Sequence, residues 1–170
     1  MVHTIKGQTP KIHESVFVAW NAEITGNVTI DENASIWFSA SIRGDMNSVT
    51  IGKGSNVQDN CVIHTDSTRG ASVGDNVTVG HGAILHSCTI GNNTTVGMGA
   101  IVLDGAKVGA NSMVAAGSVV PPGKEFPDGS MIMGSPAKVA REMRPEEIEG
   151  FAKNCQSYVE MGQLYRAECK

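Results

Sequence analysis

The sequence predicts an all-β fold: a parallel β-helix shaped as a triangular prism, with one α-helix at its C-terminal end. Three observations predict it. Aliphatic side chains recur every six residues along most of the 170-residue chain. The apolar set is rich in β-branched residues, 18 Val and 13 Ile against 3 Leu, and such side chains favour strands. Glycine is abundant, with 20 residues, and suits frequent tight turns.

The aliphatic residues of this six-residue repeat outline the prism. Six residues form one short strand and one bend, so three units close a coil, and the inward aliphatic side chains then stack in columns. The repeat positions are Ile12, Val18, Ile24, Ile30, Ile36, Ile42, Ile51, Val57, Ile63, Val73, Val79, Leu85, Ile90, Val96, Val102, Val108, Val114 and Val120.

The spacing of the repeat changes at three places. It lengthens by about three residues within 42–51 and by about four within 63–73, and it shortens by about one within 85–90. Insertions in a solenoid bulge from one edge without disturbing the stack, and they commonly mark the binding face. We therefore expect functional residues to lie near these interruptions.

The end of the repeat divides the chain into parts of one structural domain. A β-helix is expected over 1–123, because Pro121 and Pro122 should stop further strand pairing. A connector follows over 124–144. A helix is expected over 145–170, with Pro145 at its first position and apolar residues at helical spacing along it. We expect this helix to pack along one flank of the prism.

Composition and charge exclude several classes of function. The net charge of −4 leaves no basic stripe for a phosphate backbone, so nucleic acid is not an expected partner. No apolar run approaches the roughly 18 residues needed to cross a bilayer, and the N-terminal residues resemble no export signal. The four cysteines show no CxxC spacing. We expect free thiols and a cytoplasmic protein.

Counting three repeat units per coil places polar residues far apart in sequence above one another. Arg43, His64 and His86 each follow an aliphatic residue one coil apart, so they should face outward in one column. The same count places Asp59 and His81 in a second column on a different wall, with Gln58 beside it.

Two histidines one coil apart can share a metal ion, because imidazole nitrogens lie about 2.0–2.1 Å from zinc. His64 and His86 would supply two ligands. A third from His81 is strained within one chain, but in a threefold homotrimer His81 of a neighbour can face the pair, leaving a fourth position open to water. Zinc is the preferred metal, and iron or cobalt also suits imidazole.

A metal held by three imidazoles generates hydroxide at neutral pH, a nucleophile for carbon dioxide or an acyl carbonyl. Gln58 can orient that metal-bound hydroxide. Arg43 can pair with Asp59 or Asp45 across a subunit interface and lend a positive field to an anionic product. The alternative is that Arg43, Asp45 and Asp59 form a structural interface pair only.

The remaining histidines and cysteines fit simpler interpretations. His3 and His13 are expected to be ordinary surface residues. Cys88 is a candidate soft ligand, but its place in the shortened repeat argues against that role. Cys61 occupies an inward slot of the repeat and should belong to the core.

These residues resemble the gamma class of carbonic anhydrases, left-handed β-helix proteins of the hexapeptide-repeat superfamily. The resemblance covers essentially the whole chain, including the C-terminal helix. The matching strings are Ile42-Arg43-Gly44-Asp45, Asn56-Val57-Gln58-Asp59, Val62-Ile63-His64, Gly80-His81-Gly82-Ala83 and Leu85-His86.

The resemblance implies the left-handed coil and reversible hydration of carbon dioxide to bicarbonate in a homotrimer. It implies His64 and His86 of one subunit and His81 of its neighbour as metal ligands. Gln58 would position the hydroxide, and Arg43 and Asp59 would be joined across the interface. Tyr158 resembles a tyrosine that many relatives bring near the metal.

The chain departs from the best-characterised pattern in its acidic loop, since Met46 follows Asp45. Other functions therefore stay open: a metal-assisted thioesterase or hydrolase acting on an acyl-CoA, a hexapeptide acyltransferase, or a trimeric scaffold without catalysis.

Overall fold

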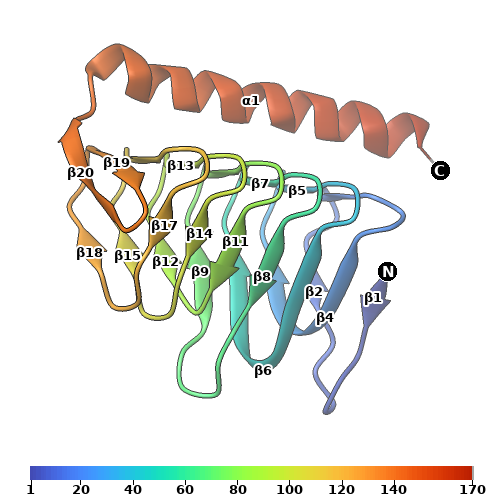
Figure 1. Cartoon of the computed structure of the whole chain (residues 1–170). Helices are drawn as coiled ribbons and strands as arrows, with labels where there is room; N and C mark the ends of the chain where they lie inside the picture. The colour runs from blue at the N-terminus through green and yellow to red at the C-terminus, as the bar shows by residue number, and fades with distance from the viewer. Residues whose placement is uncertain (170) are drawn as a thin grey trace.

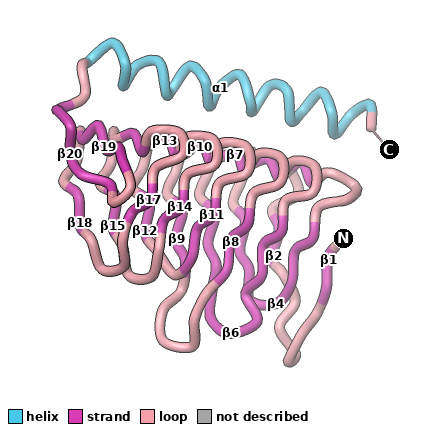
Figure 2. The backbone as a smooth tube through the Cα atoms, in the orientation of Figure 1, coloured by secondary structure: helices cyan, strands magenta, loops and turns pink. Residues whose placement is uncertain are grey.

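The computed structural model describes residues 1–169 as a left-handed parallel β-helix with one helix along its side (Figure 1). Short strands alternate with tight turns through successive coils, as Figure 2 shows. Two longer strands bend across a corner and join two of the three walls: β4 (Glu23–Ile30) and β6 (Ser41–Ile51). The predicted fold class is confirmed.

The strands stack in register to form three walls. The first wall contains the early parts of β4 and β6 with β1 (Val2–His3), β8 (Val62–His64), β11 (Ile84–His86), β14 (Ile101–Val102) and β17 (Val119–Val120). The second wall contains the later parts of β4 and β6 with β2 (Lys11–Ile12), β9 (Ala71–Val73), β12 (Thr89–Ile90), β15 (Lys107–Val108) and β18 (Glu125–Phe126).

The third wall is a separate sheet and carries the helix. Its parallel strands are β3 (Phe17–Val18), β5 (Ser35–Ile36), β7 (Asn56–Val57), β10 (Thr78–Val79), β13 (Thr95–Val96), β16 (Met113–Val114) and β19 (Ser130–Gly134). The antiparallel strand β20 (Ala137–Glu142) pairs with β19 at the end of the sheet.

The core consists of the aliphatic columns that the repeat predicts. Ile42, Ile63 and Leu85 stand in register on the first wall and are fully buried. The narrow prism has space for a single layer of aliphatic side chains from each wall. This explains why the core needs so few aromatic residues.

Strand pairing continues beyond the predicted end of the β-helix at Gly123. β18 pairs with β15, β19 pairs with β16, and β20 turns back on β19. The two prolines do not stop pairing, because they lie in the turn between β17 and β18 rather than in a strand. Residues expected to form a connector over 124–144 thus complete the last coil.

The first insertion also differs from the expected bulge. Residues 41–51 form one continuous strand, β6, which bends around the corner between the first and second walls. The second insertion does form a loop over 65–70, between β8 and β9. Both features extend the same edge of the prism (Figure 1).

The helix α1 (Pro145–Glu168) runs back along the third wall toward the N-terminal coils, as expected for a flank of the prism (Figure 1). Lys170, the last residue of the predicted helix, lies outside the described residues. Cys155 and Gly162 are its buried residues. The Cα of Gly162 approaches Ser35 so closely that an added Cβ would lie 3.2 Å from the Ser35 Cβ, and this small residue lets the helix dock.

An ion-pair cluster fixes the start of the helix. Glu147 accepts hydrogen bonds of 2.8 Å from both terminal nitrogens of Arg141, and another of 2.8 Å from Arg144. It also accepts the backbone N–H of Arg144 at 3.0 Å. These bonds hold the pKa of Glu147 well below its ordinary value of 4.5, and they tie β20 to the first turn of α1.

Candidate metal centre

Two histidines stand one above the other on the outer face of the first wall. Arg43, His64 and His86 occupy equivalent positions of β6, β8 and β11, as the coil count predicts. The Nδ1 atom of His64 lies 3.1 Å from the Nε2 atom of His86. Both rings are partly buried, so the two nitrogens face each other at the protein surface.

A carboxylate holds each of these imidazoles from its other side. The Nε2 atom of His64 lies 3.1 Å from the Oδ1 atom of Asp45, and the Nδ1 atom of His86 lies 2.7 Å from the Oδ1 atom of Asp104. Metal-binding histidines almost always donate their second N–H to such a partner, which fixes the tautomer and the ring orientation.

The third histidine has the same kind of partner at a different corner. His81 follows β10 and stands one coil above Asp59, whose Oδ2 atom lies 2.8 Å from its Nδ1 atom. The His81 side chain is 43% exposed, and its Nε2 atom remains available. Within residues 1–169, no group of three or more His, Cys, Asp or Glu side chains is arranged to hold a metal ion. One chain therefore does not bring His81 to His64 and His86.

Gln58 is held beside His81 by two hydrogen bonds. Its Oε1 atom accepts the backbone N–H of His81 at 3.1 Å, and its Nε2 atom donates to the Oδ1 atom of Asn56 at 3.1 Å. The side chain is buried, with 4% of its surface exposed. The orientation of this amide is consequently fixed.

Arg43 pairs with Asp45 of its own chain rather than with Asp59. Its Nη1 atom lies 2.6 Å from the Oδ2 atom of Asp45. Desolvation raises the pKa of Asp45, but hydrogen bonds from Arg43 and His64 outweigh it and lower the pKa below its ordinary value. Asp45 therefore links the arginine to the first histidine of the column.

Tyr158 reaches the same region from α1. With Gln58 and His81 it lines a cavity of about 350 Å³ between the helix and the third wall. Burial, reinforced by the negative charge of Asp59, raises the pKa of Tyr158. Its hydroxyl therefore stays protonated at neutral pH.

Asp104 is the site residue that the sequence reasoning missed. Val102 stands directly above Leu85, so Leu103 and Asp104 follow it just above His86. Continuing the coil count by one coil would have found this carboxylate. The count alone could not show that the side chain of Asp104, in the turn after β14, bends back toward His86 in the coil beneath it.

The cysteines do not belong to this site. Cys61 and Cys88 are buried, as the predicted core position of Cys61 requires. Burial raises the pKa of Cys61 to about 11 and that of Cys88 to about 12. Both therefore remain thiols, which are poor metal ligands. All four cysteines are free, including Cys155 under the helix.

The arrangement of donors on the first wall fits a transition metal. Two ligand nitrogens on one tetrahedral zinc ion, each at 2.0–2.1 Å, are about 3.4 Å apart. The His64 and His86 nitrogens, at 3.1 Å, are close to that separation. Imidazoles oriented by carboxylates suit zinc, iron or cobalt.

Comparison with known proteins agrees with this fold. A family model described as "Bacterial transferase hexapeptide (six repeats)" matches residues 87–122, and "Hexapeptide repeat of succinyl-transferase" matches residues 48–87. A crystal structure of a hexapeptide transferase family protein from Anaplasma phagocytophilum superposes with a TM-score of 0.93 and 42% identity. The match covers 96% of this chain and 97% of that one.

Two curated relatives carry a more specific name. The carbonic anhydrase of Geobacillus kaustophilus is 44% identical over 167 residues, which cover 98% of this chain and 92% of the relative. Gamma carbonic anhydrase 2, mitochondrial, of Arabidopsis thaliana is 39% identical over 167 residues. That match covers 95% of this chain but only 60% of the plant protein, so the chain spans less than two thirds of its length.

The repeat and the prism define a hexapeptide-repeat β-helix protein. Within that class, the chain belongs to the gamma carbonic anhydrase-like family, on the basis of its near full-length similarity to the Geobacillus carbonic anhydrase and its similarity to the Arabidopsis gamma carbonic anhydrase. Within residues 1–169, no helix is long and apolar enough to cross a membrane.

Proposed function

We propose that the protein is a metal-dependent carbonic anhydrase that converts carbon dioxide reversibly to bicarbonate. One observation carries the proposal: the facing nitrogens of His64 and His86, 3.1 Å apart, in rings that Asp45 and Asp104 orient from behind. Such an arrangement leaves one nitrogen of each ring at the surface and points both nitrogens toward one position, where a metal ion can be held. The names of the two carbonic anhydrase relatives support the same reaction.

The third ligand is His81 of a neighbouring subunit in a homotrimer. His81 offers its Nε2 atom at a corner of the prism while Asp59 holds its other nitrogen. The first wall presents Val62 and Ile84 outward beside the histidine column, 39% and 37% exposed. Apolar side chains in such a position favour coverage by a second copy of the chain.

The chemistry of the donors favours zinc, with iron or cobalt as alternatives. When bound by three imidazoles, such a metal lowers the pKa of a coordinated water to about 7 and so supplies a nucleophile at neutral pH.

The surrounding residues of the chain orient the attacking oxygen and balance the charge of the product. Gln58 presents an amide fixed by Asn56 and by the His81 backbone, and this amide orients the attacking oxygen. Arg43 pairs with Asp45 of its own chain and keeps 48% of its side chain exposed. The exposed part provides positive charge for the bicarbonate anion and would contact Asp59 of a neighbouring subunit, as the resemblance implies. The hydroxyl of Tyr158, which stays protonated, donates a hydrogen bond into the metal site from the side of α1.

Metal analysis and kinetics test this function. Protein purified without chelator should contain close to one metal ion per chain, and His81→Ala should lose it. The matched control His13→Ala, an exposed histidine outside the site, should retain it. Stopped-flow assays should then detect hydration of carbon dioxide. A metal-free trimer, or turnover on thioesters alone, would contradict the proposal.

Acyl transfer or hydrolysis with coenzyme A thioesters is the second candidate. The matched family models and the Anaplasma structure are described as transferases, which favours it. In an acyltransferase a histidine would act as a base rather than as a ligand. Acetyl-CoA turnover that survives removal of all metal would identify the acyltransferase, whereas thioester hydrolysis that is lost with the metal would identify the metal-assisted hydrolase. The free thiols favour a cytoplasmic location for either activity.

A further inference from the structure

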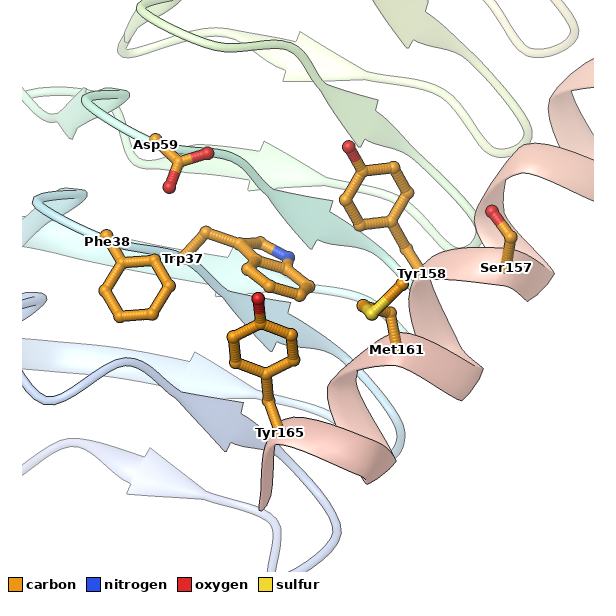
Figure 3. Close-up of a pocket in the computed structure, with 7 residues that line it drawn as sticks. All are labelled: Trp37, Phe38, Asp59, Ser157, Tyr158, Met161 and Tyr165. Carbon is orange, nitrogen blue, oxygen red and sulfur yellow. The ribbon is translucent and has the colours of Figure 1, made fainter. Parts of the chain in front are cut away.

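Six residues stand above one another at the corner between the third and first walls, and we call them the corner column. Each lies two residues after the aliphatic residue of a third-wall strand, and those strands pair in register. Backbone hydrogen bonds join the coils, as from Gly99 to the carbonyl of His81 at 2.9 Å. Figure 3 shows Phe38 and Asp59, two successive members, beside a cavity that Tyr158 also lines. From the N-terminal coil upward, the corner column contains Trp20, Phe38, Asp59, His81, Met98 and Ala116.

Two large apolar side chains of the corner column are left uncovered. Trp20 is 77% exposed and Met98 is 61% exposed. Two such side chains in line on one corner indicate contact with another molecule. His81 lies between them in the same column, and in the proposed function it reaches a neighbouring subunit. That neighbour therefore explains why both side chains are apolar.

The coil count shows what Met98 meets on that neighbour. In a threefold trimer whose axis runs along the prisms, equal coils lie at equal heights. His81 then faces the interval between His64 and His86 of the neighbour. Met98, one coil higher, faces the interval above His86. Leu103 stands there, at the position equivalent to His86 one coil lower.

Met98 also lines the cavity of about 350 Å³ between α1 and the third wall, and His81 joins this cavity to the proposed metal site. The floor of the cavity is glycine. A Cβ added to Gly80 or Gly97 would lie 2.9 Å or 2.5 Å, respectively, from a backbone nitrogen of the coil above. No side chain can therefore fill this space from the wall.

The lining of this cavity suits an uncharged molecule. Its apolar surface comes from Val96, Met98, Met113 and Phe151, and within residues 1–169 no Asp, Glu, Lys or Arg side chain lines it. A bicarbonate ion or the phosphates of a coenzyme would find no opposite charge there, and burying an unpaired charge is costly. An uncharged apolar molecule incurs no such cost and is stabilised by leaving water.

We propose that Met98 is a specificity-determining residue of the metal site, and that the apolar cavity beside it holds uncharged carbon dioxide before attack. This inference rests on the proposed function, because it names where the substrate of that reaction is held. Met98 and Leu103 of the neighbour would cover the space above His86 with apolar groups. Arg43 lies on the opposite side of the histidine pair, so the substrate is held on the apolar side and the anionic product leaves toward positive charge.

Two substitutions of Met98 test its role toward the substrate. Met98→Gln keeps the length of the side chain but makes it polar, and it should raise the KM for carbon dioxide about fivefold, with kcat within about twofold and metal content unchanged. Met98→Leu restores an apolar group and should keep the KM within about twofold of the wild type. Met133→Gln, a methionine of β19 that is 47% exposed, is the matched control and should behave as the wild type. An unchanged KM in Met98→Gln, or an equal rise in Met98→Leu, would overturn the proposal.

A disulfide tests the contact with the neighbour without turnover. In a Cys169→Ser background, which removes the exposed thiol, chains with Met98→Cys and Leu103→Cys should form cross-linked dimers and trimers on oxidation. Met113→Cys with Leu103→Cys is the control and should not cross-link, because Met113 lies under α1 rather than at the corner. No cross-link in a verified trimer of the first variant would overturn the placement of Met98.

Xenon separates this proposal from the proposed reaction, because it enters apolar cavities without metal or turnover. Crystals of the trimer under xenon pressure should show the atom beside Met98, with about fivefold lower occupancy in Met98→Gln. Xenon at this place in a protein that does not hydrate carbon dioxide would contradict the proposed function and support the apolar subsite. An active carbonic anhydrase with no xenon there would overturn the subsite and leave the proposed function standing.

Discussion

The middle coils and the upper coils of the prism have the same interior and different exteriors. Across residues 41–86 the repeat is interrupted, and the outward positions hold Arg43, Gln58 and three histidines. Across residues 89–120 the six-residue spacing is uninterrupted, and equivalent positions hold Met98, Leu103 and Ala116. The inward columns are buried aliphatic residues in both regions. Inward positions thus specify the fold, and the outward positions of the middle coils hold the candidate ligands.

The largest effect should come from removing an outward ligand of the middle coils. His86→Ala should lower the metal affinity by much more than 10–100-fold, which is roughly the loss typical of a residue that only orients a ligand. The unfolding transition of the metal-free protein should hardly change, because the side chain adds nothing to the core. Metal content by mass spectrometry and thermal melting after chelation measure the two properties. A large loss of stability in the metal-free variant would mean that this outward histidine also supports the fold, which would contradict the comparison.

The converse change is a core truncation in the upper coils. Ile90 is 1% exposed in β12. Ile90→Ala should lower the free energy of unfolding by roughly 2–5 kcal/mol, because it removes buried methyl groups and leaves a cavity. Denaturant titration measures this loss. Metal content per folded chain should remain that of the wild type, and a reduced content would mean that the two regions are coupled.

Asp104 sharpens the comparison, because it lies in the upper coils but contacts a histidine of the middle ones. Asp104→Asn should weaken metal affinity roughly 10–100-fold, since His86 loses the carboxylate that fixes its ring. Competition with a chelator gives the affinity. Glu160→Gln, an exposed acid on α1, is the matched control and should have no effect. Unchanged affinity in Asp104→Asn would remove Asp104 from the site.

The smallest effect should appear at the start of the helix. Glu147→Gln removes the ion pairs with Arg141 and Arg144 and should lower the melting temperature less than Ile90→Ala does. Folding depresses the pKa of Glu147, so its contribution is complete above the ordinary pKa of 4.5 and is lost as the pH falls below it. Melting curves of the two proteins should therefore differ most at pH 7, and the difference should shrink as the pH falls from 4.5 toward the depressed pKa of Glu147 in the folded protein. A constant difference would assign the effect to packing.

Most of the fold could be predicted from the sequence, because a six-residue period leaves few alternatives. The columns and the register of His64 with His86 followed from it, and the helix on one flank followed from Pro145 and the helical spacing of the apolar residues after it. The last coil was not predicted, because the sequence alone does not show whether Pro121 and Pro122 end the β-helix or occupy a turn between two of its strands. The continuous strand β6 was missed for a similar reason, since an insertion can bend a strand instead of forming a loop.

The site was less predictable than the fold. The coil count brought Asp59 to His81 and Arg43 beneath His64, but it could not show that Arg43 would choose Asp45, two residues along the same strand. Nor could it find the apolar cavity beside His81, because Met98 and Phe151 are far apart in sequence and line one space only when the helix returns along the wall. The ligand roles of His64, His81 and His86 remain predictions.

Complementation between two inactive variants tests the central claim most directly. His64→Ala and His81→Ala chains should each bind little metal alone, because each loses one ligand from every site. After the two are unfolded together and refolded, mixed trimers should regain some sites in which His64 and His86 of one chain face His81 of another. Metal content and carbon dioxide hydration should recover in part. No recovery in verified mixed trimers would contradict a site shared between subunits.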